Sequence, residues 1–203
     1  MEVKMLLRSV LSKFLACALL FYATTISATV VNIDATRYGF AFPTDPAPVI
    51  GQIINPFSTS GPLNQLTLSA GTYTITNANG LPGANPDFTA LRFNDMGGSN
   101  WAWGFVIADD SDKRVVLYGE AGGLSNTKSG IADQLSVQNF VSTLYLPTTT
   151  TLDFMIRDYY LADNAGGVAL NITAVPEPEA YVMLLAGLSW LGFMARQRKE
   201  LAM

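Results

Sequence analysis

The chain has 203 residues, of which 49% are hydrophobic and 14% charged, with a formal net charge of −4. It contains no histidine, which excludes Ser-His-Asp and Cys-His nucleophiles, histidine metal sites and imidazole proton shuttles. A pI of about 4.7 argues against a nucleic-acid partner, since nucleic acids bind to basic surfaces.

The N-terminal segment has the three-part layout of a secretory signal peptide. A positive region (Lys4, Arg8, Lys13) precedes an apolar run from Phe14 to Ala23, and small and polar residues follow. The apolar run is too short to span a membrane, which takes around 20 helical residues. We therefore predict a helical signal peptide over residues 1–28. It would direct the chain through the Sec translocon and then be removed by signal peptidase.

Residues 29–174 form an acidic body between the two termini, with a net charge of −6. The body has no cysteine, because Cys17 lies in the predicted signal peptide, so it cannot form disulfides. Its sequence consists of short alternating runs broken by Gly, Pro, Asn and Ser, without a sustained helical period. About eight to ten strands at this spacing predict an all-β fold, either an antiparallel β-sandwich or a jelly roll.

The alternating runs locate the strands along the body. The proline-rich segment 43–62 is expected to be a long surface loop that holds a proline-bearing edge strand. Trp101 and Trp103 share a strand face with Phe105 and Ile107, which favours a core position over an exposed platform for sugar rings. The predicted strands lie within residues 63–69, 72–77, 87–95, 101–109, 114–120, 134–147, 149–158 and 166–173.

Asp109, Asp110 and Asp112 place three carboxylates within four residues, between two predicted strands. Such a group could bind calcium or form a solvated hairpin turn. The run lacks the glycine and the distal glutamate of an EF-hand loop, and the turn is the favoured interpretation.

Asp158, Asp163 and Asn164 bring further side-chain oxygens into the loop before the last strand. Calcium takes about six to eight oxygen ligands from loops of this kind. With Gly166, the segment resembles the last hairpin of small galactose-binding β-sandwich lectins, in which calcium bridges protein and sugar hydroxyls. The resemblance implies that Asp158, Asp163 and Asn164 bind calcium, the one cofactor considered for this chain. An ordinary tight turn built from Asx and Gly residues is the alternative.

Tyr159 and Tyr160 lie in the same loop and are candidates for sugar binding. Aromatic rings are common platforms for sugars, so a polysaccharide ligand is considered together with calcium.

The C-terminal segment has three parts in order. A stiff Pro-Glu-Pro element comes first, followed by an uncharged apolar run of sixteen residues at 180–195 and then a basic cluster at 196–199. An apolar helix followed by basic residues is a stop-transfer arrangement, which predicts a transmembrane helix over about 180–195 with its basic end in the cytoplasm. The residues that define this signal are Pro176, Glu177, Pro178, Arg196, Arg198 and Lys199.

Residues 175–203 closely resemble the PEP-CTERM sorting signal of Gram-negative bacteria. The match lies in Pro-Glu-Pro at 176–178, the run Leu184–Leu188, Leu191-Gly192 and the basic stop. The resemblance implies that an exosortase in the inner membrane recognises the tail and cleaves at or near Pro-Glu-Pro. The body would then pass from a transient anchor at the inner membrane to the cell surface or extracellular matrix, in association with exopolysaccharide or biofilm.

Three functions are considered for the whole protein. The favoured one is a non-catalytic surface or matrix protein handled by exosortase, because both termini concern routing and the body lacks histidine. The alternative is a calcium-dependent carbohydrate-binding module. A secreted glycosidase is less favoured, since it needs two carboxylates about 5–10 Å apart across one cleft, which the sequence does not reveal.

Overall fold

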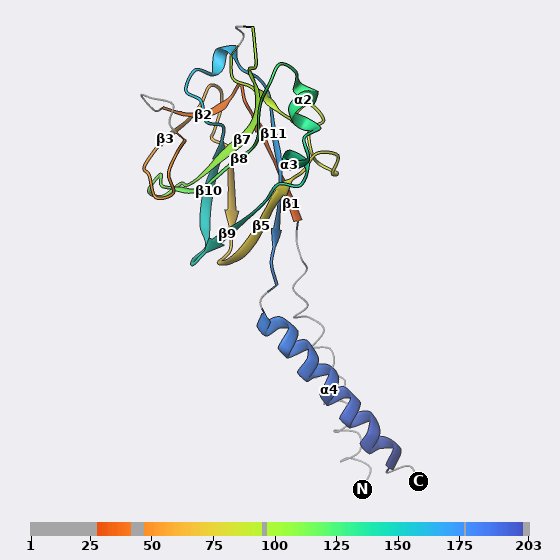
Figure 1. The fold of residues 1–203 in the computed structure, drawn as a ribbon. Coiled ribbons are helices and arrows are strands. Elements are labelled where there is room, and N and C mark those ends of the chain that lie inside the picture. The colour runs from red at the N-terminus through yellow and green to blue at the C-terminus, as the bar shows by residue number, and fades with distance from the viewer. Residues whose placement is uncertain (1–27, 42–46, 95–96, 177, 201–203) are drawn as a thin grey trace. The chain divides into compact units, whose positions relative to one another are not determined.

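The structure, a computed structural model, describes residues 28–41, 47–94, 97–176 and 178–200 (Figure 1). Residues 27–175 form one compact unit, and the last helix, α4 (Pro178–Glu200), belongs to a second. The predicted signal peptide lies outside the described residues except for Ala28, which begins the first strand and pairs with Thr173.

Strands dominate the body, and their bounds are as follows. The first six are β1 (Ala28–Asp34), β2 (Tyr38–Ala41), β3 (Asn55–Ser58), β4 (Gln65–Leu68), β5 (Gly71–Asn77) and β6 (Leu91–Arg92). The others are β7 (Trp101–Asp109), β8 (Val115–Ser125), β9 (Val141–Leu146), β10 (Thr150–Met155) and β11 (Ala165–Ala174). The short helices of the body are α2 (Lys128–Ala132), α3 (Leu135–Gln138) and the 3-10 turn η1 (Leu161–Asp163).

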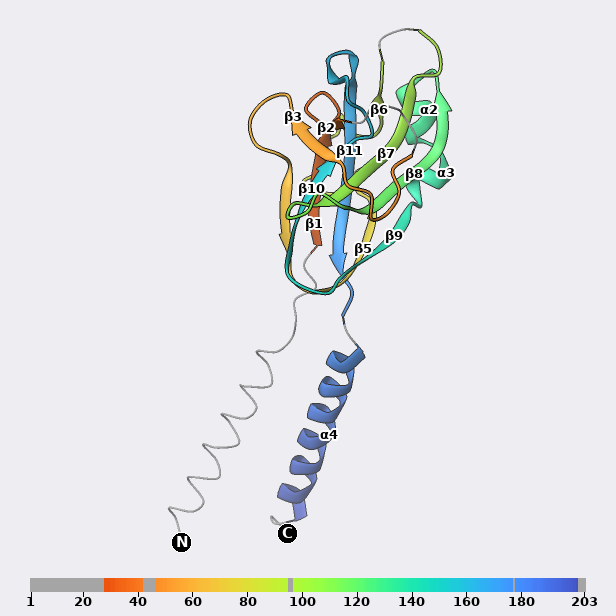
Figure 2. The same ribbon diagram turned by 90° about the vertical axis from the view of Figure 1, so that its left-hand side faces the viewer.

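All strand pairs are antiparallel, which confirms the all-β prediction for the described body. Nine strands form one hydrogen-bonded sheet (Figure 2). Seven of them follow the order β4-β10-β7-β6-β11-β5-β9, and the other two pair at its side, β1 with β11 and β8 with β7. Strand β11 links two layers, because its first residues pair with β6 and its later residues pair with β5 and β1.

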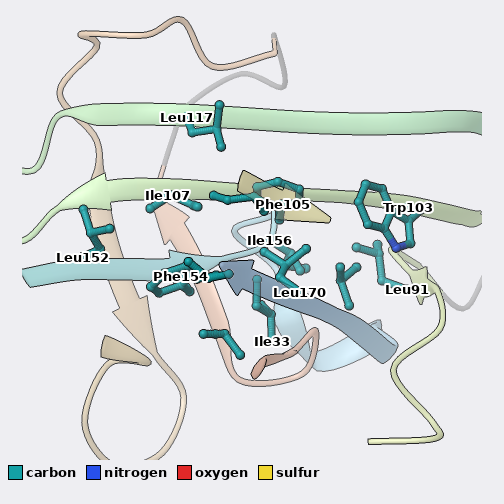
Figure 3. Packing of buried hydrophobic residues seen from close by; sticks show 14 of the residues in the cluster. Ile33, Leu91, Trp103, Phe105, Ile107, Leu117, Leu152, Phe154, Ile156 and Leu170 are labelled. Atoms are coloured by element: carbon teal, nitrogen blue, oxygen red, sulfur yellow. The ribbon is translucent and has the colours of Figure 1, made fainter. Parts of the chain in front are cut away.

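The main apolar core lies where side chains of the two layers meet. Figure 3 shows Ile33 and Leu170 of one layer beside Phe154 of the other. Trp103 is completely buried and packs edge-on against Phe105, with ring centroids 5.6 Å apart. The prediction that Trp103 is a core residue is therefore confirmed, and Trp101 packs against the same cluster while partly buried.

A second apolar cluster covers the outer side of β7, β8 and β10. Strands β2 and β3 form a separate two-stranded sheet, and Phe40 and Ile54 from this region pack against Val106 and Met155. Strand β3 contains Pro56, so the predicted proline-bearing edge strand within 43–62 is confirmed. Strands β7 and β10 are consequently buried on both faces along part of their length.

Two predicted strands are wrong in part. Within the described part of segment 87–95, only Leu91–Arg92 is a strand, because Asn85 accepts a hydrogen bond from the backbone N–H of Asp87 at 3.0 Å and starts a turn. Segment 134–147 begins with helix α3 instead of a strand. Helix α2 before it is capped by Thr127, whose hydroxyl accepts from the backbone N–H of Gly130 at 3.0 Å.

Helix α4 covers the apolar run predicted as a transmembrane helix. It begins at Pro178, which suits the first helical turn because proline lacks an N–H that would need a partner there. Among the described residues, no helix is long and apolar enough to cross a membrane. The transmembrane helix predicted over about 180–195 is therefore not confirmed.

Candidate functional site

The Pro-Glu-Pro element lies at the junction between the last strand and the last helix. The backbone N–H of Val175 donates to the carbonyl of Thr72 at 2.8 Å, which is the last backbone pairing of the described body before the tail. Pro176 follows and has no N–H to donate, while Pro178 already belongs to α4. Glu177 lies outside the described residues. The sorting element therefore begins where strand pairing ends.

Helix α4 presents apolar side chains in every direction. Successive residues in an α-helix are about 100° apart, so the exposed set encircles the axis. The hydroxyl of Ser189 donates to the carbonyl of Leu185 at 2.8 Å and so is satisfied inside the helix. A helix that is apolar all round needs a covering partner, whether protein or lipid. The exposed apolar residues are Leu184, Leu185, Leu188, Trp190, Leu191 and Phe193.

The basic cluster follows the apolar part of α4. Arg196 is exposed, and the side chains of Arg198 and Lys199 lie outside the described residues. All three follow the apolar run in the same helix, which keeps the order predicted for the signal.

The structure brings Asp158, Asp163 and Asn164 together around η1. Asp158 accepts a hydrogen bond from the backbone N–H of Tyr160 at 2.9 Å, and the Asn164 side chain also hydrogen-bonds to Asp158. The amide of Asn164 further donates to the carbonyl of Ala35 at 3.1 Å, which ties the loop to the end of β1. The three residues of the predicted calcium site thus share one loop, and Asp158 and Asn164 share one hydrogen-bond network.

Side-chain oxygen atoms that can accept hydrogen bonds lie close together in this loop. Burial raises the pKa of Asp158, and the nearby charge of Asp163 acts in the same direction. Asn164 is 7% exposed, and its Oδ1 and the Oδ1 of Asp163 are buried without a hydrogen-bond partner. Within the described residues, no three His, Cys, Asp or Glu side chains are grouped to hold a metal ion. The candidate site therefore offers two carboxylates and one amide.

Tyr159 and Tyr160 lie at the surface beside this network, with 57% and 58% of each residue exposed. Both rings are accessible to a ligand, in contrast to Trp103. Their role in sugar binding stays a prediction.

The aspartates at 109, 110 and 112 form the hairpin turn between β7 and β8. Asp109 accepts from the backbone N–H and hydroxyl of Ser111, at 2.8 and 2.7 Å. Asp112 pairs with Arg114 at 3.0 Å, whereas Asp110 contacts Lys113. Each carboxylate has its own partners, as expected for a turn.

The sequence analysis missed a polar network around Asp153. This residue is 1% exposed, with its carboxylate 3.1 Å from Lys113 Nζ and 2.8 Å from Gln65 Nε2. The sequence feature that could have revealed this network is a single carboxylate inside the apolar run Leu152–Ile156, at a strand position with apolar neighbours on both sides. A lone charge in such a run indicates a buried partner.

Comparison with known families identifies the tail. The family described as the PEP-CTERM protein-sorting motif matches residues 174–199, from the end of β11 through the basic cluster. Searches among curated proteins and among solved structures give no match. The chain therefore carries a PEP-CTERM sorting motif, and the resemblance of its tail is confirmed. The lectin-like resemblance of the 158–164 loop stays a prediction.

Proposed function

We propose that this protein is an exported, non-catalytic surface or extracellular-matrix protein that an exosortase recognises and cleaves at its tail. The observation that carries the proposal is the sorting motif at 174–199. The motif joins a stiff proline element, an apolar helix and a basic cluster in one order, and its proline element directly follows the body's last pairing.

The proposed route has three steps. The signal peptide directs export through the Sec translocon, and the tail then holds the protein at the inner membrane. Exosortase cleaves at or near Pro176-Glu177-Pro178 and passes the body to the surface or matrix. Association with exopolysaccharide is inferred from the resemblance of the tail, and the acidic, cysteine-free body is the part that would remain there.

The route is tested by fractionating the native host with and without its exosortase. Mass spectrometry of the released protein is expected to find a C-terminus near residues 176–178, and the strain without exosortase should retain the full tail in its membrane fraction. Replacing Pro176, Glu177 and Pro178 by alanine should block release, while the matched change Glu200→Ala beyond the basic cluster should not. A released protein with an intact tail would contradict the proposal.

A second candidate for the body is calcium-dependent carbohydrate binding. The observation that favours it is the pair of buried acceptor oxygens without a partner, on Asp163 and Asn164, beside the carboxylate of Asp158. Unpartnered buried oxygens are costly unless a cation or water satisfies them. Asp158, Asp163 and Asn164 would hold the ion, and Tyr159 and Tyr160 would contact a sugar.

This candidate is tested with two readouts on the full chain. Calcium should raise the melting temperature relative to excess chelator, and Asp163→Asn should remove the shift while Asp112→Asn, at an exposed turn, should keep it. Retention on immobilised polysaccharide should fall in Tyr159→Ala but not in Tyr145→Ala, a similarly exposed tyrosine on β9. An unchanged melting temperature with calcium would remove the metal half of the candidate.

A further inference from the structure

The amine of Lys113, whose side chain is 34% exposed, reaches the buried carboxylate of Asp153 in an arrangement that suits covalent chemistry. Lys113 Nζ lies 3.1 Å from Oδ2 of Asp153, a carboxylate that is 1% exposed. A second carboxylate, Asp110, contacts the same amine. We propose that Lys113 and Asp153 condense to an intramolecular isopeptide bond that ties the β7–β8 turn to strand β10.

The backbone around both groups is held in place. Asp153 pairs with Gln65 on one side and with Ala108 on the other. The turn that carries Lys113 is fastened to β10, because the N–H of Asp110 donates to the carbonyl of Thr151 at 2.9 Å. The amine and the carboxyl group are therefore held close together, which replaces a bimolecular encounter by a local step.

Lys113 has an unusual backbone conformation. Its φ of 61° is the one positive value among the described non-glycine residues. This left-handed region favours glycine and asparagine, and such strain recurs where a side chain has to be held in a particular place. A glycine would suit the turn better, so the lysine points to a requirement for its amine.

The polar neighbours match the roles that amide formation needs. Gln65 Nε2 donates to Oδ1 of Asp153 at 2.8 Å, where it can stabilise the negative charge that develops on that oxygen during attack. It also donates to Asp110 at 2.9 Å and so orients the second carboxylate. Burial acts to lower the pKa of Lys113, but hydrogen bonds and charges from Asp110 and Asp153 outweigh it, and the pKa is raised. The amine must therefore lose a proton before it attacks, and Asp110 is in position to accept it.

The reaction balances without an external reagent. Asp110 takes a proton from the Lys113 ammonium and passes it to Oδ2 of Asp153, and the free amine attacks Cγ of the neutral carboxyl group. The Nζ–Cγ bond forms, the Cγ–Oδ2 bond breaks, and Oδ2 leaves as water with two protons that originate on Nζ. Asp110 relays these protons and ends as it began. The positive charge of the amine and the negative charge of Asp153 both disappear.

The amide product would stabilise the body in two ways. The buried carboxylate of Asp153 carries a desolvation cost while it is charged, which a neutral amide removes. The body has no cysteine, so an isopeptide bond would supply the covalent constraint that disulfides give to many exported domains. The link would close a loop between positions 40 residues apart.

The test is peptide mapping of the full chain, purified folded and digested with trypsin. Acylated Lys113 resists cleavage, so peptide 93–114 is expected joined to peptide 129–157, lighter than their sum by the mass of one water. Recovery of the two regions as separate peptides of full mass from folded protein would overturn the proposal and leave an ordinary ion pair.

Two variants keep the test specific. Lys113→Arg retains the positive charge but cannot form this amide, so it should regain the mass of water and melt at a lower temperature than the wild type. Asp110→Asn keeps the size and removes the proton acceptor, so the linked peptide should be lost or strongly reduced. A water deficit that persists in Lys113→Arg would place the modification elsewhere and refute the assignment.

Discussion

Gly166 occupies a position where an added methyl group should disturb both the sheet and the candidate loop. It follows Asn164 by two residues, has a φ of 73° and pairs with Leu91 at the junction of β11 and β6. A Cβ built on it would lie 2.4 Å from the carbonyl oxygen of Ala90. That oxygen accepts the N–H of Gly167 at 3.1 Å, so the bond would have to move as well.

The expected cost of Gly166→Ala has two parts. An L-residue in the left-handed region costs roughly 1–2 kcal/mol. Forcing a methyl group against a fixed carbonyl costs about 1–3 kcal/mol more, as for other overpacked sites. The free energy of unfolding should therefore fall by about 2–5 kcal/mol, a large share of the roughly 5–15 kcal/mol of an ordinary domain.

Gly80→Ala is the matched control for this prediction. Gly80 has a similar φ of 79°, yet nothing lies within 4 Å of its added Cβ. Urea unfolding of the full chain, followed by tryptophan fluorescence to which the buried Trp103 contributes, should show only the strain of about 1–2 kcal/mol for this variant. Equal losses in the two variants would refute the close approach of Ala90.

Other predictions concern the core, the loop and a helix cap. Phe154→Ala removes a ring that is 1% exposed and should lower the free energy of unfolding by about 3–5 kcal/mol in urea titrations. Thr127→Ala deletes the cap of α2 and should cost about 1 kcal/mol by the same assay. Because burial raises the pKa of Asp158, its carboxyl group stabilises the fold most below the ordinary aspartate value, and this contribution is lost as pH rises through the raised value. Asp158→Asn keeps the hydrogen-bond acceptor for the N–H of Tyr160 but does not ionise. The stability of this variant should therefore fall less than that of the wild type as pH rises through the raised pKa, measured by melting at a series of pH values. An equal fall would contradict the burial effect.

Alternating hydrophobicity predicted strands best where a strand has one buried face. In β5, which covers the predicted strand 72–77, Tyr73 and Ile75 alternate with threonines and are buried. The strand predicted at 87–95 was wrong in part because the Asn85 side chain accepts a hydrogen bond from the backbone N–H of Asp87. This bond competes with strand pairing, and the alternation of the sequence does not reveal it. The first part of the strand predicted at 134–147 was wrong for a related reason, since the four residues of α3 are too few to show a helical period.

The candidate sites divide in the same way. The tail could be identified from sequence because its parts are contiguous, so order alone carries the signal. The Asp158–Asn164 loop is also local, which is why its members could be grouped in advance. Asp153 and Gln65 are 88 residues apart and meet only through the pairing of β10 with β4, which no short-range pattern contains.

The place of the sorting element also explains how one chain can carry a removable tail. Strand β11 is central to the body, since it pairs with β1, β5 and β6, and damage to it would affect both layers. Its pairing ends with Ala174, and the last backbone bond that follows belongs to Val175. Cleavage within residues 176–178 would therefore remove no strand pairing from the described body. Stability of the body can then evolve separately from the tail, because the bond proposed to be cleaved lies outside the hydrogen-bonded sheet.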